Sequence, residues 1–406
     1  MHLSNKKIIK LGMVCLLSIV GACTDTVKNN ADNIARLVLN DTSIIIGQLA
    51  EGGKTESFLG VPFAEPPVGD LRWAPPQPLV KTTATSQKNE YAAACMQGDH
   101  IAKWYKNVAA DFGGDPELIK HPEVSEDCLY LNIWRPAAEA QSAERLPVIV
   151  YIHGGSNKGG WSYEPNYIGH NLASKGVIVI SIAYRLGVFG FFSHPTLEHS
   201  NFGLLDQIAA LQWVNDNIIA LGGDAERITV MGESAGANNI GHLVTMPAGE
   251  GLFSRAIHQS GGSFMTNRSD KETLLKLGSE FLGKSIGDEN GNTLSKIRQL
   301  PAETLIAAAK DVYSGYYFDP VVDGMSVMEP IFNTIKAGKM HRVDLLIGSN
   351  DDDWLMDTDD HPDIEGWLKA QVKPSEADSL KALLKDQTDD RRKADLLDTA
   401  KHYVCP

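Results

Sequence analysis

The stretch Arg227-Ile-Thr-Val-Met-Gly-Glu-Ser-Ala-Gly-Ala237 constrains the fold of this chain more than any other. Its apolar run, 228–231, predicts a buried strand, which is followed by the pattern Gly-x-Ser-x-Gly and by residues that can continue as a helix. In such a strand–turn–helix unit the serine is presented as a nucleophile on a sharp turn. Glycine is needed at both ends because a larger side chain would collide with neighbouring backbone. The alternative is a glycine-rich turn with an incidental serine, since the short pattern is common.

Length and charge limit the kinds of protein that this chain can be. It has 406 residues, of which 43% are hydrophobic and 22% charged, so it can bury a large core. This length would allow two or three domains, but large α/β folds run long as single domains. The net charge of -14 and the lack of a basic stripe disfavour nucleic acid as a partner. The sequence has no metal-ligand cluster and no phosphate-binding loop, so we expect no metal and no cofactor.

Residues 1–22 have the organisation of a signal peptide. Lysines precede a short apolar run, Leu11 to Val20, which is too short to span a bilayer. Val20-Gly21-Ala22-Cys23 resembles a bacterial lipobox, in which the cysteine is lipidated, and the alternative is an ordinary secretory signal cleaved after Ala22. The polar residues 23–33 predict a flexible tether. We therefore expect an exported protein, either lipid-anchored to a bacterial membrane at Cys23 or periplasmic or extracellular.

Apolar runs alternate with a helical pattern along the rest of the chain. Short runs predict strands at 35–39, 43–49, 129–134, 146–152, 177–183, 228–231, 255–258 and 345–347. Apolar residues at helical spacing predict a helix from Phe202 to Leu221, which Asn201 can cap. The prolines of the segment Phe58–Trp73 predict an ordered surface loop rather than a central strand or helix. Together these patterns predict an α/β fold whose mainly parallel sheet is covered by helices on both faces.

Two further segments can complete the chemistry of a nucleophilic serine. Attack on a carbonyl needs donors for the oxygen that becomes negative. His153-Gly154-Gly155 directly follows a predicted strand and offers two backbone N–H groups, and the amide of Ala235 is the third donor. The alternative for this segment is a plain Gly-Gly turn, and we expect the His153 side chain to be structural. An acid should follow at the end of a later strand, where three consecutive aspartates occupy 351–353.

Several longer segments carry a family resemblance. Phe58 to Trp73 resembles F-x-G-I-P-Y-A-x-P-P-V-G-x-L-R-F, and Ser125 to Pro136 contains Glu-Asp-Cys-Leu-Tyr-Leu-Asn. Segments 183–190, 203–207 and 251–261 follow in the same order. From about Ser43 to its last residue the chain thus resembles the type-B carboxylesterases, the family that includes the cholinesterases.

The resemblance implies an α/β-hydrolase fold and a serine carboxylester hydrolase that acts on a small carboxylic ester through an acyl-enzyme. It implies Ser234 as the nucleophile and Gly154, Gly155 and Ala235 as the oxyanion donors. It places the acid at Asp353, where the family more usually has glutamate, with Asp352 as the alternative. A peptidase or a lipase on the same fold is a further interpretation, and the oligomeric state is not predicted.

The same resemblance assigns structural residues. Of the five cysteines, Cys95 and Cys128 match the family's first disulfide, whereas Cys405 is left without a partner. Arg72 and Glu126 lie in motifs where the family forms an internal ion pair. Trp104 and Tyr105 lie in the loop where cholinesterases place a cation-binding tryptophan, but we expect these aromatic rings to pack the loop.

One element of the family pattern is missing. The family's general base is a histidine in a G-x-x-H-G segment downstream of the acid, and this sequence contains no such segment. His258, His361 and His402 are weaker substitutes, because they lack that context. We therefore expect residues 34–406 to be a hydrolase domain that is incomplete at its C-terminus, with ester hydrolysis near background. The alternative function is a catalytically inactive, cholinesterase-like binding protein, although the intact Ser234 and its glycines argue against it.

Overall fold

The computed structural model describes residues 34–50, 52–80, 84–137, 144–264, 270–286, 294–314 and 316–350. All of these belong to one compact unit of the chain. Several predictions fall outside the described residues: the signal peptide (1–22), lipidation at Cys23, the tether (23–33) and both candidate acids, Asp352 and Asp353.

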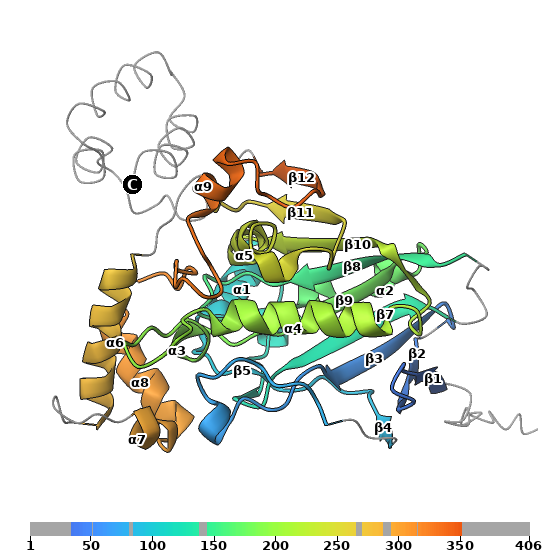
Figure 1. Cartoon of the computed structure of the whole chain (residues 1–406). Coiled ribbons are helices and arrows are strands. Elements are labelled where there is room, and N and C mark those ends of the chain that lie inside the picture. Colours follow the sequence, from blue (N-terminus) through green and yellow to red (C-terminus); the bar gives the residue numbers. More distant parts are fainter. Residues whose placement is uncertain are drawn as a thin grey trace, which may run out of the picture. The chain divides into compact units, whose positions relative to one another are not determined.

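A mixed sheet of ten strands organises the described residues (Figure 1). Its order is β1-β2-β3-β7-β9-β8-β10-β11-β12, and β4 pairs with β2. The strands are β1 (Ile34–Val38), β2 (Ile44–Leu49), β3 (Thr55–Pro62), β4 (Thr85–Gln87), β7 (Tyr130–Pro136), β8 (Leu146–Ile152), β9 (Ile178–Ile182), β10 (Gly223–Glu233), β11 (Arg255–Gln259) and β12 (Asp344–Gly348). A separate small sheet joins β5 (Ala94–Cys95) to β6 (Val124–Ser125).

Strand direction divides the large sheet into two parts. From β9 through β8, β10 and β11 to β12 every neighbouring pair is parallel. The neighbours β1, β2, β3, β7 and β9 are antiparallel. Parallel neighbours need crossover connections, and helices lie between β9, β10, β11 and β12 in the chain, whereas β1 to β3 are joined by short turns. The prediction of a mainly parallel sheet is therefore confirmed by the part that carries Ser234, and the first strands extend that part with antiparallel neighbours.

The prediction of a surface loop through 58–73 is wrong for its first residues. β3 is buried along its length except at its last residue, and Phe58 pairs with Ile133 of β7. The first proline of the segment, Pro62, is the last residue of the strand, so it ends the pairing rather than interrupting it. Even the loop beyond it is anchored, because Trp73 is buried and its indole Nε1 donates to the carbonyl of Val188 at 2.7 Å.

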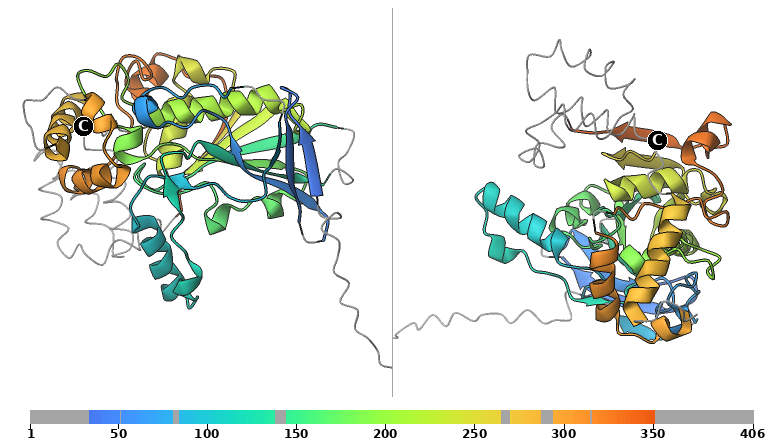
Figure 2. Two further views of the ribbon diagram at one scale, coloured as in Figure 1. Left: turned by 90° about the horizontal axis from the view of Figure 1, so that it is seen from below. Right: turned by 90° about the vertical axis from the view of Figure 1, so that its left-hand side faces the viewer.

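Helices cover both faces of the sheet, as the sequence predicts (Figure 2). α4 (Phe202–Asn217) and α5 (Ala235–Leu243) contact each other, and α2 (His170–Ala173) packs on β7 and β9 from the opposite face. The other helices are α1 (His100–Asp111), α3 (Gly187–Gly190), α6 (Lys271–Ile286), α7 (Leu294–Arg298), α8 (Ala302–Val312) and α9 (Ile331–Lys336). No helix in the described ranges is both long and apolar enough to cross a membrane.

The start of α4 corrects a detail of the sequence prediction. The predicted apolar stripe is confirmed, since Leu204, Leu211 and Val214 are fully buried. Asn201 precedes the helix, but its side chain does not cap it. Instead, Nδ2 donates to the carbonyl of Val321 at 2.8 Å and Oδ1 accepts from the Val321 amide at 2.9 Å. The amide side chain therefore fixes a distant loop rather than the first turn of its own helix.

Candidate active site

Ser234 is the single residue between β10 and α5, and its backbone is strained. Its φ of 53° and ψ of -121° lie in a region that a residue with a side chain rarely adopts. The turn is held on both sides: the Ser234 amide donates to the Gln259 carbonyl of β11 at 2.9 Å, and the Asn238 amide donates to the Ser234 carbonyl at 2.9 Å. The Ser234 side chain is only partly buried, so this arrangement presents a hydroxyl at the end of a parallel strand.

Close packing explains why glycine flanks this serine. A Cβ at Gly236 would lie 2.1 Å from the carbonyl oxygen of Ile152, at the end of the neighbouring strand β8. A Cβ at Gly154, just after β8, would lie 3.2 Å from the Cβ of Ser234. The loop after β8 and the turn at Ser234 therefore touch each other, and neither could hold a larger side chain at these positions.

In the loop after β8 the carbonyl groups of Gly154 and Gly155 have hydrogen-bond donors, whereas the amides of the same two residues lack acceptors within the described part of the chain. The Gly154 carbonyl accepts from Nδ1 of His153 at 2.9 Å, and the Gly155 carbonyl accepts from the amides of Lys158 and Gly159. Within the described part of the chain, the amides of Gly154, Gly155 and Ala235 have no hydrogen-bond acceptor. Three unpaired donors around a serine are the arrangement that a negative oxygen requires.

Sequence reasoning missed the next two residues of this loop. Ser156 and Asn157 have φ values of 58° and 53°, although neither is glycine. The Ser156 amide also has no acceptor among the described residues. Backbone of this kind persists only where surrounding contacts hold it, and Asn157 supplies them: it is fully buried, and its Nδ2 donates to the Phe318 carbonyl at 2.9 Å. No local sequence signal marks either residue.

Neither His153 nor His258 is hydrogen-bonded to Ser234. Within the described residues, no side chain is hydrogen-bonded to the Ser234 hydroxyl. Burial lowers the pKa of His153 to about 4, and its ring stacks on Tyr184, as a structural role predicts. Burial also lowers the pKa of His258 to about 4, and its Nε2 lies 3.3 Å from the hydroxyl of Ser263. The other candidates, His361 and His402, lie outside the described residues.

The strand that precedes the predicted acid, β12, lies two strands away from β10, which leads to Ser234. β12 is parallel to β11, and the Ser260 amide donates to the Gly348 carbonyl at 2.8 Å. A cleft of about 460 Å³ is lined by residues of both regions, among them Glu233, Gln259 and Asn350. The three aspartates follow Asn350 directly in the sequence. The C-terminal ends of β10, β11 and β12 therefore lie at the same edge of the sheet, and the three aspartates fall outside the described residues.

The carboxyl of Glu164 is buried and feels the charge of Glu233, the residue before Ser234. Glu164 accepts from the Tyr105 hydroxyl at 2.7 Å and from the Trp161 amide at 3.1 Å. Burial raises the pKa of Glu164 to about 7, and the nearby charge of Glu233 adds to the effect. Glu164 is therefore partly protonated near neutral pH, within electrostatic range of Glu233, the residue that precedes Ser234. Sequence reasoning did not single out this carboxyl.

Trp104 and Tyr105, the aromatic residues between Cys95 and Cys128, differ in how far they are buried. Tyr105 is buried in the small cluster that includes Trp161, as predicted for a packing residue. The Trp104 ring is 46% exposed and makes an edge contact with the Tyr105 ring at 5.0 Å. The packing prediction thus describes Tyr105 better than Trp104.

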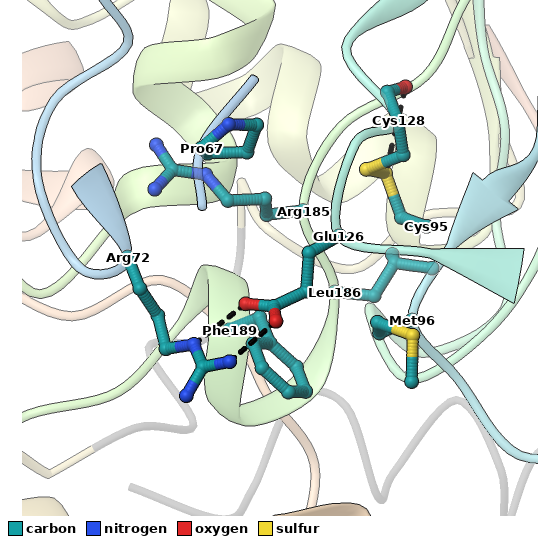
Figure 3. A pocket seen from close by; sticks show the side chains of 9 residues that line it. All are labelled: Pro67, Arg72, Cys95, Met96, Glu126, Cys128, Arg185, Leu186 and Phe189. Carbon is teal, nitrogen blue, oxygen red and sulfur yellow. Dashed lines mark hydrogen bonds and ion pairs between the residues drawn. A yellow bond between two sulfur atoms is a disulfide. The ribbon is translucent and has the colours of Figure 1, made fainter. Parts of the chain in front are cut away.

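Figure 3 shows the structural residues that the resemblance assigns. Nε of Arg72 donates to Glu126 at 2.6 Å, and a second guanidinium nitrogen pairs with the other carboxylate oxygen. Arg72 also donates to the carbonyl of Ile297 at 3.0 Å, so the pair ties the loop after β3 to α7. The structure brings Cys95 and Cys128 to disulfide distance, with Cα atoms 4.9 Å apart. These side chains line a cavity of only about 10 Å³, which has room for a single water molecule.

A second buried ion pair lies close by and was not predicted. The guanidinium of Arg185 donates to both carboxylate oxygens of Asp206, at 2.8 and 2.7 Å, and both side chains are almost completely buried. The Arg185 amide adds a third bond to the same carboxylate at 3.0 Å. This pair joins the segment after β9 to α4. Within the described residues, no group of His, Cys, Asp and Glu side chains could hold a metal ion.

Comparison with known proteins gives a consistent result. A family model described as the carboxylesterase family matches residues 41–405. The chain is 35% identical over 320 residues to a fumonisin B1 esterase of Sphingopyxis macrogoltabida, an alignment that covers 76% of this chain and 55% of that protein. It is 37% identical over 317 residues to a para-nitrobenzyl esterase of Bacillus subtilis, covering 74% of this chain and 60% of that protein. The chain therefore spans less than two thirds of the length of these relatives.

The structural comparison agrees. A solved thermophilic PNB esterase superimposes with a TM-score of 0.75 at 30% sequence identity, and the match covers 89% of this chain and 74% of that chain. The predicted α/β-hydrolase fold is thus confirmed.

Proposed function

The chain belongs to the carboxylesterase family, and we propose that it is a serine carboxylester hydrolase with Ser234 as its nucleophile. The observation that supports this most directly is the contact between two loops. Ser234 is held in a strained conformation, Gly154 packs against it, and the amides of Gly154, Gly155 and Ala235 have no acceptor among the described residues. A turn of this kind is costly to form and has no evident structural use.

The reaction follows from this geometry. The Ser234 hydroxyl attacks the carbonyl carbon of the ester, and the carbonyl oxygen becomes negative beside the unpaired amides. The alcohol leaves when the carbonyl re-forms, and water then hydrolyses the acyl-enzyme to release the acid and restore the serine. Ser156 offers a further amide in the same loop. Because these donors are fixed before the substrate arrives, they stabilise the transition state without reorganising.

The proton of the serine needs a base. We assign that role to a histidine outside the described residues, oriented by Asp353 or, as the alternative, by Asp352. The position of β12 supports the assignment of the acid, because the strand ends at the cleft that Glu233 also lines. A serine without a base is a poor nucleophile, so the turnover rate shows whether a base is in place to accept the serine proton.

The family and the two named relatives favour a small carboxylic ester as substrate. A binding protein that has lost catalysis remains the alternative. It would have no need to keep Ser234 in a strained conformation against the amides of another loop.

The test is release of p-nitrophenol from p-nitrophenyl acetate by the protein that supplies the histidine base as well as this chain, and by the Ser234→Ala variant of that protein. Loss of the nucleophile in a well-studied hydrolase lowers turnover by about a millionfold, so Ser234→Ala is expected to abolish all enzymatic release. Ser174→Ala, which changes an exposed serine at the end of α2, is the matched control and should leave the rate unchanged. If hydrolysis persists undiminished in Ser234→Ala, the proposed function is wrong.

Three further features belong to the proposal: export, a lipid at Cys23, and a disulfide between Cys95 and Cys128. The signal-like segment supports the first two, and the sulfur positions support the third. Cys23→Ala is expected to release the protein from bacterial membranes, and alkylation of the unfolded, non-reduced protein should leave Cys95 and Cys128 unmodified. A Cys23→Ala variant that stays with the membrane fraction would contradict the lipid anchor.

A further inference from the structure

We propose that Lys158 forms a subsite for a negatively charged group of the substrate, so that the preferred esters carry a carboxylate in addition to the ester bond. This inference rests on the proposed function, because it concerns the same site. The residue that carries it lies three positions after Gly155 in the loop that touches Ser234.

Lys158 belongs to the loop whose first glycine touches Ser234. The amides of Lys158 and Gly159 both donate to the Gly155 carbonyl, at 2.9 and 3.1 Å, so the loop folds back on itself within one turn. Gly154, four residues before Lys158, is packed so closely that a Cβ added to it would lie 3.2 Å from the Cβ of Ser234. Lys158 is therefore part of the loop that supplies the unpaired amides, and its position is coupled to theirs.

The ammonium group lies among aromatic rings instead of acids. Its Nζ is 5.6 Å from the ring centroid of Tyr317 and 5.9 Å from that of Phe318, within the range of a cation–π contact. The Phe318 carbonyl accepts from Asn157, so these rings are fixed to the same loop. Because Tyr317 is half exposed, the group remains open to solvent on one side.

The charge of Lys158 is not balanced within the described part of the chain. Burial alone lowers the pKa of Lys158, and no carboxylate opposes that effect. Lys88 provides a comparison, because it is buried to a similar degree but the charge of Asp127 offsets part of the cost. In a chain with 51 acidic residues against 37 basic ones, a half-buried lysine beside the reactive loop without an acid is unusual.

An anionic group on the ester would remove this imbalance. It would find its counter-charge at Lys158, in the loop that touches Ser234. Charge complementarity of this kind mainly sets specificity and orientation. The alternative is that Lys158 only packs on the two rings, in which case neutral and anionic esters should respond equally to its loss.

The test measures binding in the Ser234→Ala protein, which cannot form an acyl-enzyme. Isothermal titration compares p-nitrophenyl hydrogen succinate, which is anionic, with p-nitrophenyl butyrate, which is neutral and of the same chain length. Lys158→Gln is expected to weaken binding of the succinate ester by about tenfold and that of the butyrate ester by less than about twofold. Added salt should weaken the preference of the Lys158 protein for the anion and leave Lys158→Gln unaffected.

Two more variants complete the design. Lys158→Arg keeps the charge and should keep the preference, whereas Lys175→Gln removes an exposed lysine elsewhere and should change neither affinity. Far-ultraviolet circular dichroism of each variant checks that the fold is intact. Equal loss of affinity for both esters, or no loss for either, would overturn the subsite. Discrimination between the esters without any turnover when Ser234 and the histidine base are both present would instead overturn the proposed function and leave the subsite standing.

Discussion

Asn157 and Asn239 link the loop after β8 to the helix after Ser234 through their buried amide side chains. Nδ2 of Asn239 donates to Oδ1 of Asn157 at 2.9 Å, and Nδ2 of Asn157 lies 3.3 Å from Oδ1 of Asn239. The Tyr184 hydroxyl donates to the same Asn157 oxygen at 3.2 Å. The pair therefore fixes the distance between the unpaired amides of the loop and the turn that holds the serine.

We predict that Asn239→Ala lowers kcat/KM for p-nitrophenyl acetate by about 10- to 100-fold, because small displacements of preorganised donors are costly. The loss should fall mainly on kcat, since the donors act in the transition state. Steady-state kinetics measures this effect. The free energy of unfolding should also fall by about 1–3 kcal/mol, because the buried amide of Asn157 loses one of its hydrogen-bond partners. Asn215→Ala, which removes a half-buried amide of α4, is the control. A kcat unaffected by Asn239→Ala would contradict the positioning role.

A methyl group at Gly236 should disrupt the turn that holds Ser234. Its Cβ would lie 2.1 Å from the Ile152 carbonyl oxygen, which belongs to the backbone and cannot move independently. We expect Gly236→Ala to reduce the free energy of unfolding by about 1–3 kcal/mol and to abolish ester hydrolysis. Urea denaturation and p-nitrophenyl acetate assays measure the two effects. Gly348→Ala is the matched control, because no atom lies within 4 Å of the added Cβ, and wild-type activity in Gly236→Ala would show that the turn is less constrained than the structure indicates.

The buried carboxyl of Glu164 should make stability depend on pH. Below about pH 4.5 the group is protonated in the folded and the unfolded chain and has no effect. Between about pH 4.5 and pH 7 the unfolded chain loses this proton while the folded protein keeps it, so the free energy of unfolding falls as pH rises. Above about pH 7 the full cost, about 3 kcal/mol, remains.

Glu164→Gln removes this titration and keeps the hydrogen bond from Tyr105 possible. The difference in free energy of unfolding between the wild-type protein and Glu164→Gln should therefore change by about 3 kcal/mol from pH 4.5 to pH 7, in favour of the variant at the higher pH. Urea denaturation at several pH values measures it. Glu303→Gln, at an exposed position of α8, should show no such trend. A constant difference across this range for Glu164→Gln would mean that the carboxyl ionises normally.

The ion pair between Arg185 and Asp206 should be costly to break. Removing the carboxylate by Asp206→Ala leaves a guanidinium buried without its partner, for which we expect a loss of about 3–5 kcal/mol in the free energy of unfolding. Asp344→Ala breaks an exposed ion pair in which Nε of Arg255 lies 3.7 Å from Oδ2 of Asp344. The free energy of unfolding should then fall by less than about 1 kcal/mol. Chemical denaturation compares the two. Similar losses for both variants would contradict the importance of burial.

Much of the fold could be predicted from the sequence because its signals are local. Apolar runs marked β8 with the bounds that the structure has, and helical spacing marked the buried stripe of α4. The glycines around Ser234 predicted a strand–turn–helix, and the structure has β10 and α5 there. Each of these signals lies within one element or turn, so no distant residue was needed to interpret it.

The errors have the opposite origin. The prolines after β3 suggested a loop for all of 58–73, but pairing of Phe58 with Ile133 makes its first part a central strand. Asn201 has the sequence context of a helix cap, but its side chain is hydrogen-bonded to the backbone of Val321, which is 120 residues away. Propensity was overridden in both cases by a partner that the sequence does not place nearby.

The sequence by itself determined that this chain has an α/β-hydrolase fold, and that a serine at 234 with glycines at 154 and 155 is the place to look for its chemistry. Only the tertiary structure decided what holds and surrounds that serine: the Asn157–Asn239 link, the buried carboxyl of Glu164, and the unbalanced charge of Lys158. The physical reason is distance along the chain. Periodicity and turn chemistry act over a few residues, whereas Asn157 and Asn239 are 82 residues apart and meet only when β8 and β10 pair.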